Sequence, residues 1–179
     1  MLTITIPSYE LFNDVTQEFI SEDERVIQLE HSLLSISEWE SRWNKPFLSN
    51  MEKTSNEIID YVRCMTLTEG VPETAYLYIN NEQYKLINDY IAAPMTATTI
   101  SEPPGKASRE IMTSELLYYY MIAANIPFEC ERWHLNRLLT LIRICSIKSQ
   151  PEKKRPINEV MKSNATLNAA RKKQFNTKG

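Results

Sequence analysis

Glycine is scarce in this chain, and that scarcity restricts the available folds more than any other feature. The 179 residues include only three glycines, Gly70, Gly105 and Gly179. Phosphate-binding loops use closely spaced glycines, and a sandwich of many strands needs tight turns in which glycine supplies a positive φ. The sequence therefore predicts helices joined by proline-marked loops, in a chain long enough to bury one core.

Charge divides the chain into two parts. Residues 1–147 contain 11 Lys and Arg against 21 Asp and Glu, a net charge of −10, and residues 148–179 contain 9 against 2, a net charge of +7. We therefore predict an acidic, mainly helical globular domain over residues 1–147 and a basic C-terminal arm over residues 148–179. An acidic body with a basic arm is typical of interaction proteins more than of enzymes.

Two short segments carry strand signals, and helical signals dominate the rest. Leu2–Ile6 alternates apolar and hydroxyl residues, and residues 25–30 follow a similar pattern. Together they predict a small two-stranded antiparallel sheet at the N-terminus, packed on a helical domain. A final amphiphilic helix over about residues 157–175 would form the arm. The predicted fold class is therefore α+β, mainly α-helical.

Capping residues place the first helices. Ser35 or Ser37 is expected to cap a short helix. The Thr-Ser-Asn-Glu sequence at 54–57 is a capping box, and apolar residues follow it at helical spacing. Asn80 or Asn81 is expected to start a further helix, which must end before the proline at position 94.

Proline and polar residues divide the second half of the domain. Residues 95–106, rich in Thr, Ser and Pro, predict the clearest internal loop. A long helix is expected from Ser108 to an Asn-Ile-Pro stop at 125–127. The next helix is expected over about residues 131–145, where leucines and isoleucines form one apolar stripe.

The cysteines and histidines do not predict an active site. Cys64, Cys130 and Cys145 are odd in number and lie among apolar residues, which favours reduced, buried thiols. Cys130 and His134 are four apart and could share a helix face, but zinc takes three or four protein ligands and His31 belongs to no paired motif. A structural role is favoured for both residues. We predict no catalytic residue, metal or cofactor, and an enzyme is the least favoured class.

Neither a signal peptide nor a membrane span is predicted. The N-terminus has no basic region followed by an apolar run. The longest nearly uncharged stretch, residues 116–128, is too short to cross a bilayer. A cytoplasmic location is expected.

Two features are candidates for binding nucleic acid. The run Tyr118-Tyr119-Tyr120 could stack on bases, although on a helix at most two of these rings share a face, so a place at the edge of the core is favoured. The arm could bind phosphates, an acidic partner protein or the acidic body of another copy, or it could simply keep the chain soluble. Its main cations are Lys153, Lys154, Arg155, Arg171, Lys172 and Lys173.

Several stretches resemble one known group of proteins. They are SISEWESRWNKPFL at 35–48, IIDYVRCMT at 58–66, INDYIAAPMTAT at 87–98, IPFECERWHLNRLL at 126–139 and LNAARKK at 167–173. In these stretches the chain resembles the tail assembly chaperones of long-tailed bacteriophages, which are small cytoplasmic proteins encoded near the tape measure protein.

The resemblance implies a chaperone that binds and solubilises the tape measure protein during tail morphogenesis. It would act in the host cytoplasm, be displaced by tail tube subunits and be absent from the mature virion. Such a protein needs exposed apolar surface rather than a catalytic pocket. The candidate partner-binding residues, of which the aromatic ones are also candidate core residues, are Trp39, Trp43, Phe47, Tyr118, Trp133 and Arg137.

Two other functions compete with this expectation. One is a structural protein of the virion, such as a head–tail connector or a tail completion protein. The other is a DNA-binding packaging factor that uses the basic arm. Self-association is a further expectation, and nucleic acid is the less favoured partner.

Overall fold

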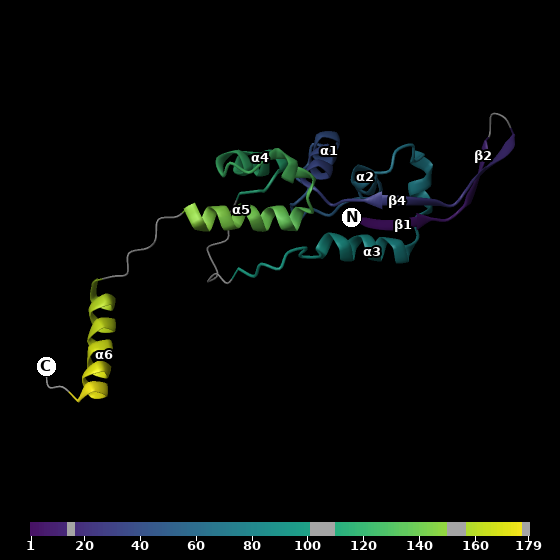
Figure 1. The fold of residues 1–179 in the computed structure, drawn as a ribbon. Coiled ribbons are helices and arrows are strands. Elements are labelled where there is room, and N and C mark those ends of the chain that lie inside the picture. Colours follow the sequence, from purple (N-terminus) through teal and green to yellow (C-terminus); the bar gives the residue numbers. More distant parts are fainter. Residues whose placement is uncertain (14–16, 101–109, 150–156, 177–179) are drawn as a thin grey trace. The chain divides into compact units, whose positions relative to one another are not determined.

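The computed structural model describes residues 1–13, 17–100, 110–149 and 157–176 (Figure 1). The chain divides into two compact units, Met1–Ser146 and Ile147–Gly179. The fold is α+β and mainly helical, as the sequence predicts.

The described elements follow one another in this order: β1 (Leu2–Ile6), β2 (Tyr9–Asn13), β3 (Glu18–Glu22), β4 (Arg25–Leu29), α1 (Leu33–Trp43), α2 (Ser55–Met65), the 3₁₀ helix η1 (Glu73–Tyr78), α3 (Asn81–Ala92), α4 (Ser114–Ala123), the 3₁₀ helix η2 (Phe128–Arg132), α5 (Leu135–Ser149) and α6 (Ile157–Phe175).

The predicted N-terminal sheet is confirmed. β1 and β4 pair antiparallel, with Ile4 opposite Ile27 and Leu2 opposite Leu29. Because side chains alternate across a strand, one face of this pair is buried in the core and the other is exposed to solvent. The sheet thus contributes one apolar face to a core that is otherwise helical.

A second pair of strands was not predicted. β2 and β3 pair antiparallel and form a ribbon that, in Figure 1, runs on from β1 and β4 beyond the helices. Tyr9 is buried at its base and stacks on Tyr78, with 4.1 Å between ring centroids. Each strand is only five residues long and contains two adjacent apolar residues rather than a strict alternation, which explains why the sequence gives only a weak strand signal here.

Capping residues define α1, α2 and α3. The cap of α1 is Ser32, so the predicted cap at Ser35 or Ser37 was wrong: Ser35 is instead the third helical residue and completes a capping box with Ser32. The capping box at 54–57 is confirmed for α2, and so is the Asn80 cap of α3. These three helix starts are therefore encoded locally.

The second half of the domain departs from prediction at two helix starts. Thr113 caps α4 and residues 110–113 are not helical, so the helix expected from Ser108 starts later; Ser108 itself lies outside the described residues. The helix expected from about residue 131 begins at Leu135, because the Leu135 N–H donates to the His31 carbonyl (2.7 Å) and Ser32 forms a β-bridge with His134. A contact from far along the chain thus replaces the predicted first turn.

The arm forms the helix that the sequence predicts, since α6 covers Ile157–Phe175. Of the predicted loop at 95–106, the described part, 95–100, contains no helix or strand, and the remainder lies outside the described residues. No helix in the described part of the chain is long and apolar enough to span a membrane.

Candidate partner-binding surfaces

One of the predicted partner-binding residues lies in the core and a second packs against it. Trp39 is 1% exposed, and its indole N–H donates to the Glu57 carbonyl (2.8 Å), which ties α1 to α2. Phe47 is half-buried between Trp39 and Tyr61, with ring centroids 5.1 and 4.0 Å away, and the Lys53 ammonium lies 4.5 Å from its ring centroid. Both side chains stabilise the packing of α1 on α2.

Trp43 is only partly buried and lies at the edge of the same helix pair. Its indole N–H donates to Oδ2 of Asp60 (2.8 Å). The other oxygen of Asp60 accepts from Arg42 (2.9 Å) and from Nε of Arg63 (3.0 Å). Asp60 therefore collects donors from both helices, and it orients Trp43 and two guanidinium groups at this surface.

The other three predicted residues lie on α4, directly after η2 and on α5. The guanidinium carbon of Arg137 lies 4.1 Å from the ring centroid of Trp133, a cation–π contact. The Tyr118 hydroxyl donates to Glu131 (2.9 Å), and burial together with this carboxylate raises the pKa of Tyr118. Tyr118 also lies 6.3 Å from Phe128, ring centroid to centroid. The structure thus joins Trp133 with Arg137, and Tyr118 with Phe128.

A surface groove between α2, η1 and α3 contains none of the predicted residues. We call it the α2–α3 groove; its volume is about 480 Å³. Ile58 is 42% exposed and Leu77 is 65% exposed, both large apolar side chains presented to solvent. The lining residues are Ser55, Ile58, Ile59, Leu77, Asn81, Tyr84 and Asn88.

Sequence reasoning missed the α2–α3 groove for a specific reason. Ile58 lies three and four residues before Tyr61 and Val62, so the helical period of α2 places it on the buried face. The structure instead leaves Ile58 42% exposed, in the first turn of the helix. The helical period alone therefore does not predict that Ile58 faces solvent. The position of Leu77 beside Ile58 depends on how η1 packs and carries no local signal.

A smaller hollow continues the α2–α3 groove along α2. It has a volume of about 270 Å³ and shares Ile59 and Leu77 with the groove. Three charged residues also line it, and Arg63 forms ion pairs with the other two, Asp60 (2.8 Å) and Glu73. The surface therefore runs from exposed aliphatic side chains to a cluster of paired charges that includes the partner of Trp43.

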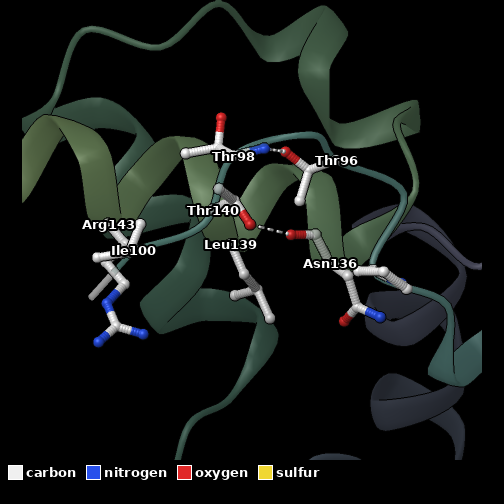
Figure 2. A pocket seen from close by; sticks show the side chains of 8 residues that line it. Thr96, Thr98, Ile100, Asn136, Leu139, Thr140 and Arg143 are labelled. Carbon is white, nitrogen blue, oxygen red and sulfur yellow. Dashed lines mark hydrogen bonds between the residues drawn. The ribbon is translucent and has the colours of Figure 1, made fainter. Parts of the chain in front are cut away.

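A third hollow, of about 360 Å³, lies between residues 94–100 and α5 (Figure 2). The Asn136 amide donates to the carbonyls of Ile91 (3.0 Å) and Ala93 (2.8 Å). The Thr140 hydroxyl donates to the Asn136 carbonyl (2.8 Å). The Asn136 amide thus holds the C-terminal end of α3 against α5, so we assign this hollow a structural role.

The two histidines form a buried pair. Their rings lie 5.1 Å apart, and Nδ1 of His31 is 2.5 Å from the Tyr61 hydroxyl. Burial, with a smaller contribution from His134, lowers the pKa of His31 to about 4. Nε2 of His134 lies 3.0 Å from the Tyr90 carbonyl and Nδ1 accepts from the Asn136 N–H (3.3 Å), which indicates a neutral ring protonated at Nε2.

The histidine contacts favour the structural interpretation of the Cys130–His134 spacing. Both residues are buried, and the two ring nitrogens of His134 are already engaged by the backbone. Over the described ranges, no three or more His, Cys, Asp or Glu residues are grouped so that they could hold a metal ion.

Two buried carboxylates organise the backbone. Glu40 accepts from the Phe47 N–H with one oxygen and from the Ser114 N–H with the other, both at 2.7 Å. Glu57 accepts from Lys45 and from Thr54, and these hydrogen bonds lower its pKa to about 2. Glu40 thus joins α1 to the start of α4, and Glu57 fixes the start of α2.

The basic arm is described only in part. Arg171, Lys172 and Lys173 are exposed near the C-terminus of α6, where cations interact favourably with the helix dipole. Lys153, Lys154 and Arg155 lie outside the described residues.

Comparison with known proteins identifies no relative of this chain. No protein-family model matches the chain, and neither a curated protein nor a solved structure matches it at a significant level.

Proposed function

We propose that this chain is a phage tail assembly chaperone that binds apolar helical segments of the tape measure protein and keeps that protein soluble. The resemblance of residues 35–48, 58–66, 87–98, 126–139 and 167–173 to such chaperones suggests the function. The α2–α3 groove is the single structural observation that supports it best.

The groove suits an amphipathic helix. Such a helix presents apolar side chains three and four residues apart on one face, and it is held when that face lies in an apolar groove. Ile58, Ile59 and Leu77 offer the apolar contact, and the Asn81 and Asn88 amides can hydrogen-bond to the polar flank of the helix. The groove thus offers apolar side chains for the apolar face of the helix and amides for its polar flank.

The groove also suits a partner that has to be released. Full burial of a Leu or Ile side chain contributes roughly 1.5–3 kcal/mol, so covering the exposed fractions of Ile58 and Leu77 contributes on the order of 1 kcal/mol each. Contacts of that size hold a segment weakly. Several copies along one long partner would keep it soluble, and polymerising tube subunits could displace them one at a time.

The test is co-expression of this chain with the tape measure protein, followed by a solubility assay and pull-down. We expect the partner to be soluble and retained with the unchanged chain, and to precipitate with the variant Ile58→Asp/Leu77→Asp. Leu86→Asp is the matched control, because Leu86 is an exposed apolar residue of α3 that does not line the groove. Equal solubility with all three chains, or no association with any, would exclude the groove as the binding site.

The competing functions give different outcomes. A connector or completion protein would persist in purified particles, whereas a chaperone should be absent from them. A packaging factor would bind duplex DNA with an affinity that falls steeply as salt rises and that disappears when residues 148–179 are deleted.

A further inference from the structure

The ribbon formed by β2 and β3 has one face that the described part of the domain leaves uncovered. Pairing places Phe12 opposite Phe19, and because side chains alternate, both lie on the face opposite Tyr9 and Leu11. Phe12 is 47% exposed and Phe19 is 71% exposed, with 5.0 Å between their ring centroids. Two aromatic rings are thus held together in solvent on a two-stranded sheet, a structure that is marginally stable alone.

The ribbon is strongly acidic. Residues 10–24 contain six Asp and Glu and no Lys or Arg. Glu10 is exposed on the same face as the two phenylalanines, and Glu18 is exposed on β3 next to Phe19. Pairing two such ribbons would bring like charges together, which is unfavourable. The chemistry of the ribbon therefore fits a basic partner that carries apolar side chains.

The α6 helix of this same chain has that chemistry. Residues 161–176 contain four Lys and Arg and no Asp or Glu. Leu167, Arg171 and Phe175 are spaced four apart and form one stripe of the helix, and all three are exposed. A helix with few apolar residues is marginally stable without a partner, so α6, like the ribbon, would gain stability from a contact.

We propose that the β2–β3 ribbon of one copy of this chain is covered by α6 of a second copy. Phe12 and Phe19 would contact Leu167 and Phe175, while Arg171 lies within reach of the ribbon carboxylates. The contact joins different surfaces of the two copies, so it is head-to-tail and extends into a chain or closes into a ring. This goes beyond the proposed function and does not depend on it.

The first test is sedimentation velocity of the full chain over a range of protein and salt concentrations. We expect association that rises with protein concentration and weakens between low and high salt, because the contact combines opposite charges at the surface. Phe12→Ser/Phe19→Ser and Arg171→Glu/Lys172→Glu should each sediment as a monomer under the conditions in which the unchanged chain associates. Leu86→Ser, the control for loss of an exposed apolar side chain, should still associate.

Mixing the two variants gives the decisive result. The ribbon variant keeps an intact α6 and the α6 variant keeps an intact ribbon, so one functional contact remains between them. We expect a 1:1 complex of about 42 kDa, twice the chain mass of 20.9 kDa, with no larger species. A monomeric unchanged chain at low salt, association that survives in either variant, or a mixture that stays monomeric would each overturn the proposal. Circular dichroism of each variant, compared with the unchanged chain, shows whether it is folded.

Discussion

Helices α2 and α6 both form where the sequence predicts a helix, yet different forces stabilise them. α2 has a capping box, a buried face and a buried carboxylate at its start. α6 is longer, but all its described side chains, at 161–175, are exposed. The comparison indicates that α2 is stabilised by tertiary packing, whereas α6 depends on its intrinsic propensity and on whatever partner it meets.

The largest expected effect is loss of the tertiary packing between α1 and α2. Trp39→Ala removes the indole that joins α1 to α2. Because Trp39 is only 1% exposed, we expect the free energy of unfolding to fall by about 3–5 kcal/mol. Denaturant titration measures the loss. The NMR shifts of residues 161–176 should not change, because every described side chain of α6 is exposed and none belongs to the buried core. A loss below about 1 kcal/mol would contradict the core role of Trp39.

The next effect concerns the carboxylate that joins α1 to α4. Glu40→Gln replaces one accepting oxygen with an NH₂ group that faces a backbone N–H, so a buried donor loses its partner. We expect a loss of about 1–3 kcal/mol in unfolding free energy. Glu38→Gln is the control on the same helix: Glu38 is largely exposed and pairs with Arg42, so its loss should stay below about 1 kcal/mol. Equal losses from the two substitutions would show that the buried hydrogen bonds of Glu40 stabilise the fold no more than the surface ion pair of Glu38 does.

A pH effect of similar size comes from His31. Its pKa is about 4 in the fold and 6.5 in the unfolded chain, so below pH 6.5 the unfolded state takes up a proton that the folded state does not. The free energy of unfolding is therefore highest above pH 6.5 as far as His31 is concerned. It falls as the pH drops toward 4, by about 2 kcal/mol between pH 7 and pH 5. Unfolding titrations at these two pH values measure the slope. In His31→Asn the slope should largely disappear even if the variant is less stable overall, and an unchanged slope would contradict this account.

The smallest expected effect is removal of the arm. Deleting residues 150–179 removes α6, whose described side chains contribute nothing to the buried core. We expect the unfolding free energy of the remaining chain to change by less than about 0.5 kcal/mol when measured at low protein concentration. A larger loss would show that α6 packs on the rest of the chain and would remove the contrast with α2.

Local signals explain which parts of the fold the sequence could predict. The capping box of α2, the Asn80 cap and the bounds of α6 depend on residues close together in the chain, and so does the alternating pattern within β1 and within β4. The start of α4 does not, because the carboxylate that accepts from the Ser114 N–H is Glu40, 74 residues away. The start of α5 likewise depends on the His31 carbonyl.

The candidate site was harder to predict than the fold. Composition identifies Trp39 and Phe47 as large apolar side chains, but whether such a residue is buried or exposed depends on tertiary packing. The same packing exposes Ile58 and Leu77 beside one another. Neither exposure could have been inferred in advance, because the helical period places Ile58 on the buried face of α2 and Leu77 carries no local signal.

Photo-crosslinking shows directly whether the α2–α3 groove contacts the tape measure protein. A photoreactive phenylalanine analogue is placed at position 77 in the groove or, as control, at position 86 on the exposed side of α3, and the chain is co-expressed with the partner. We expect a crosslink from position 77 to apolar helical segments of the partner and little from position 86. Equal crosslinking from both positions, or none from position 77 in a complex that does form, would contradict it.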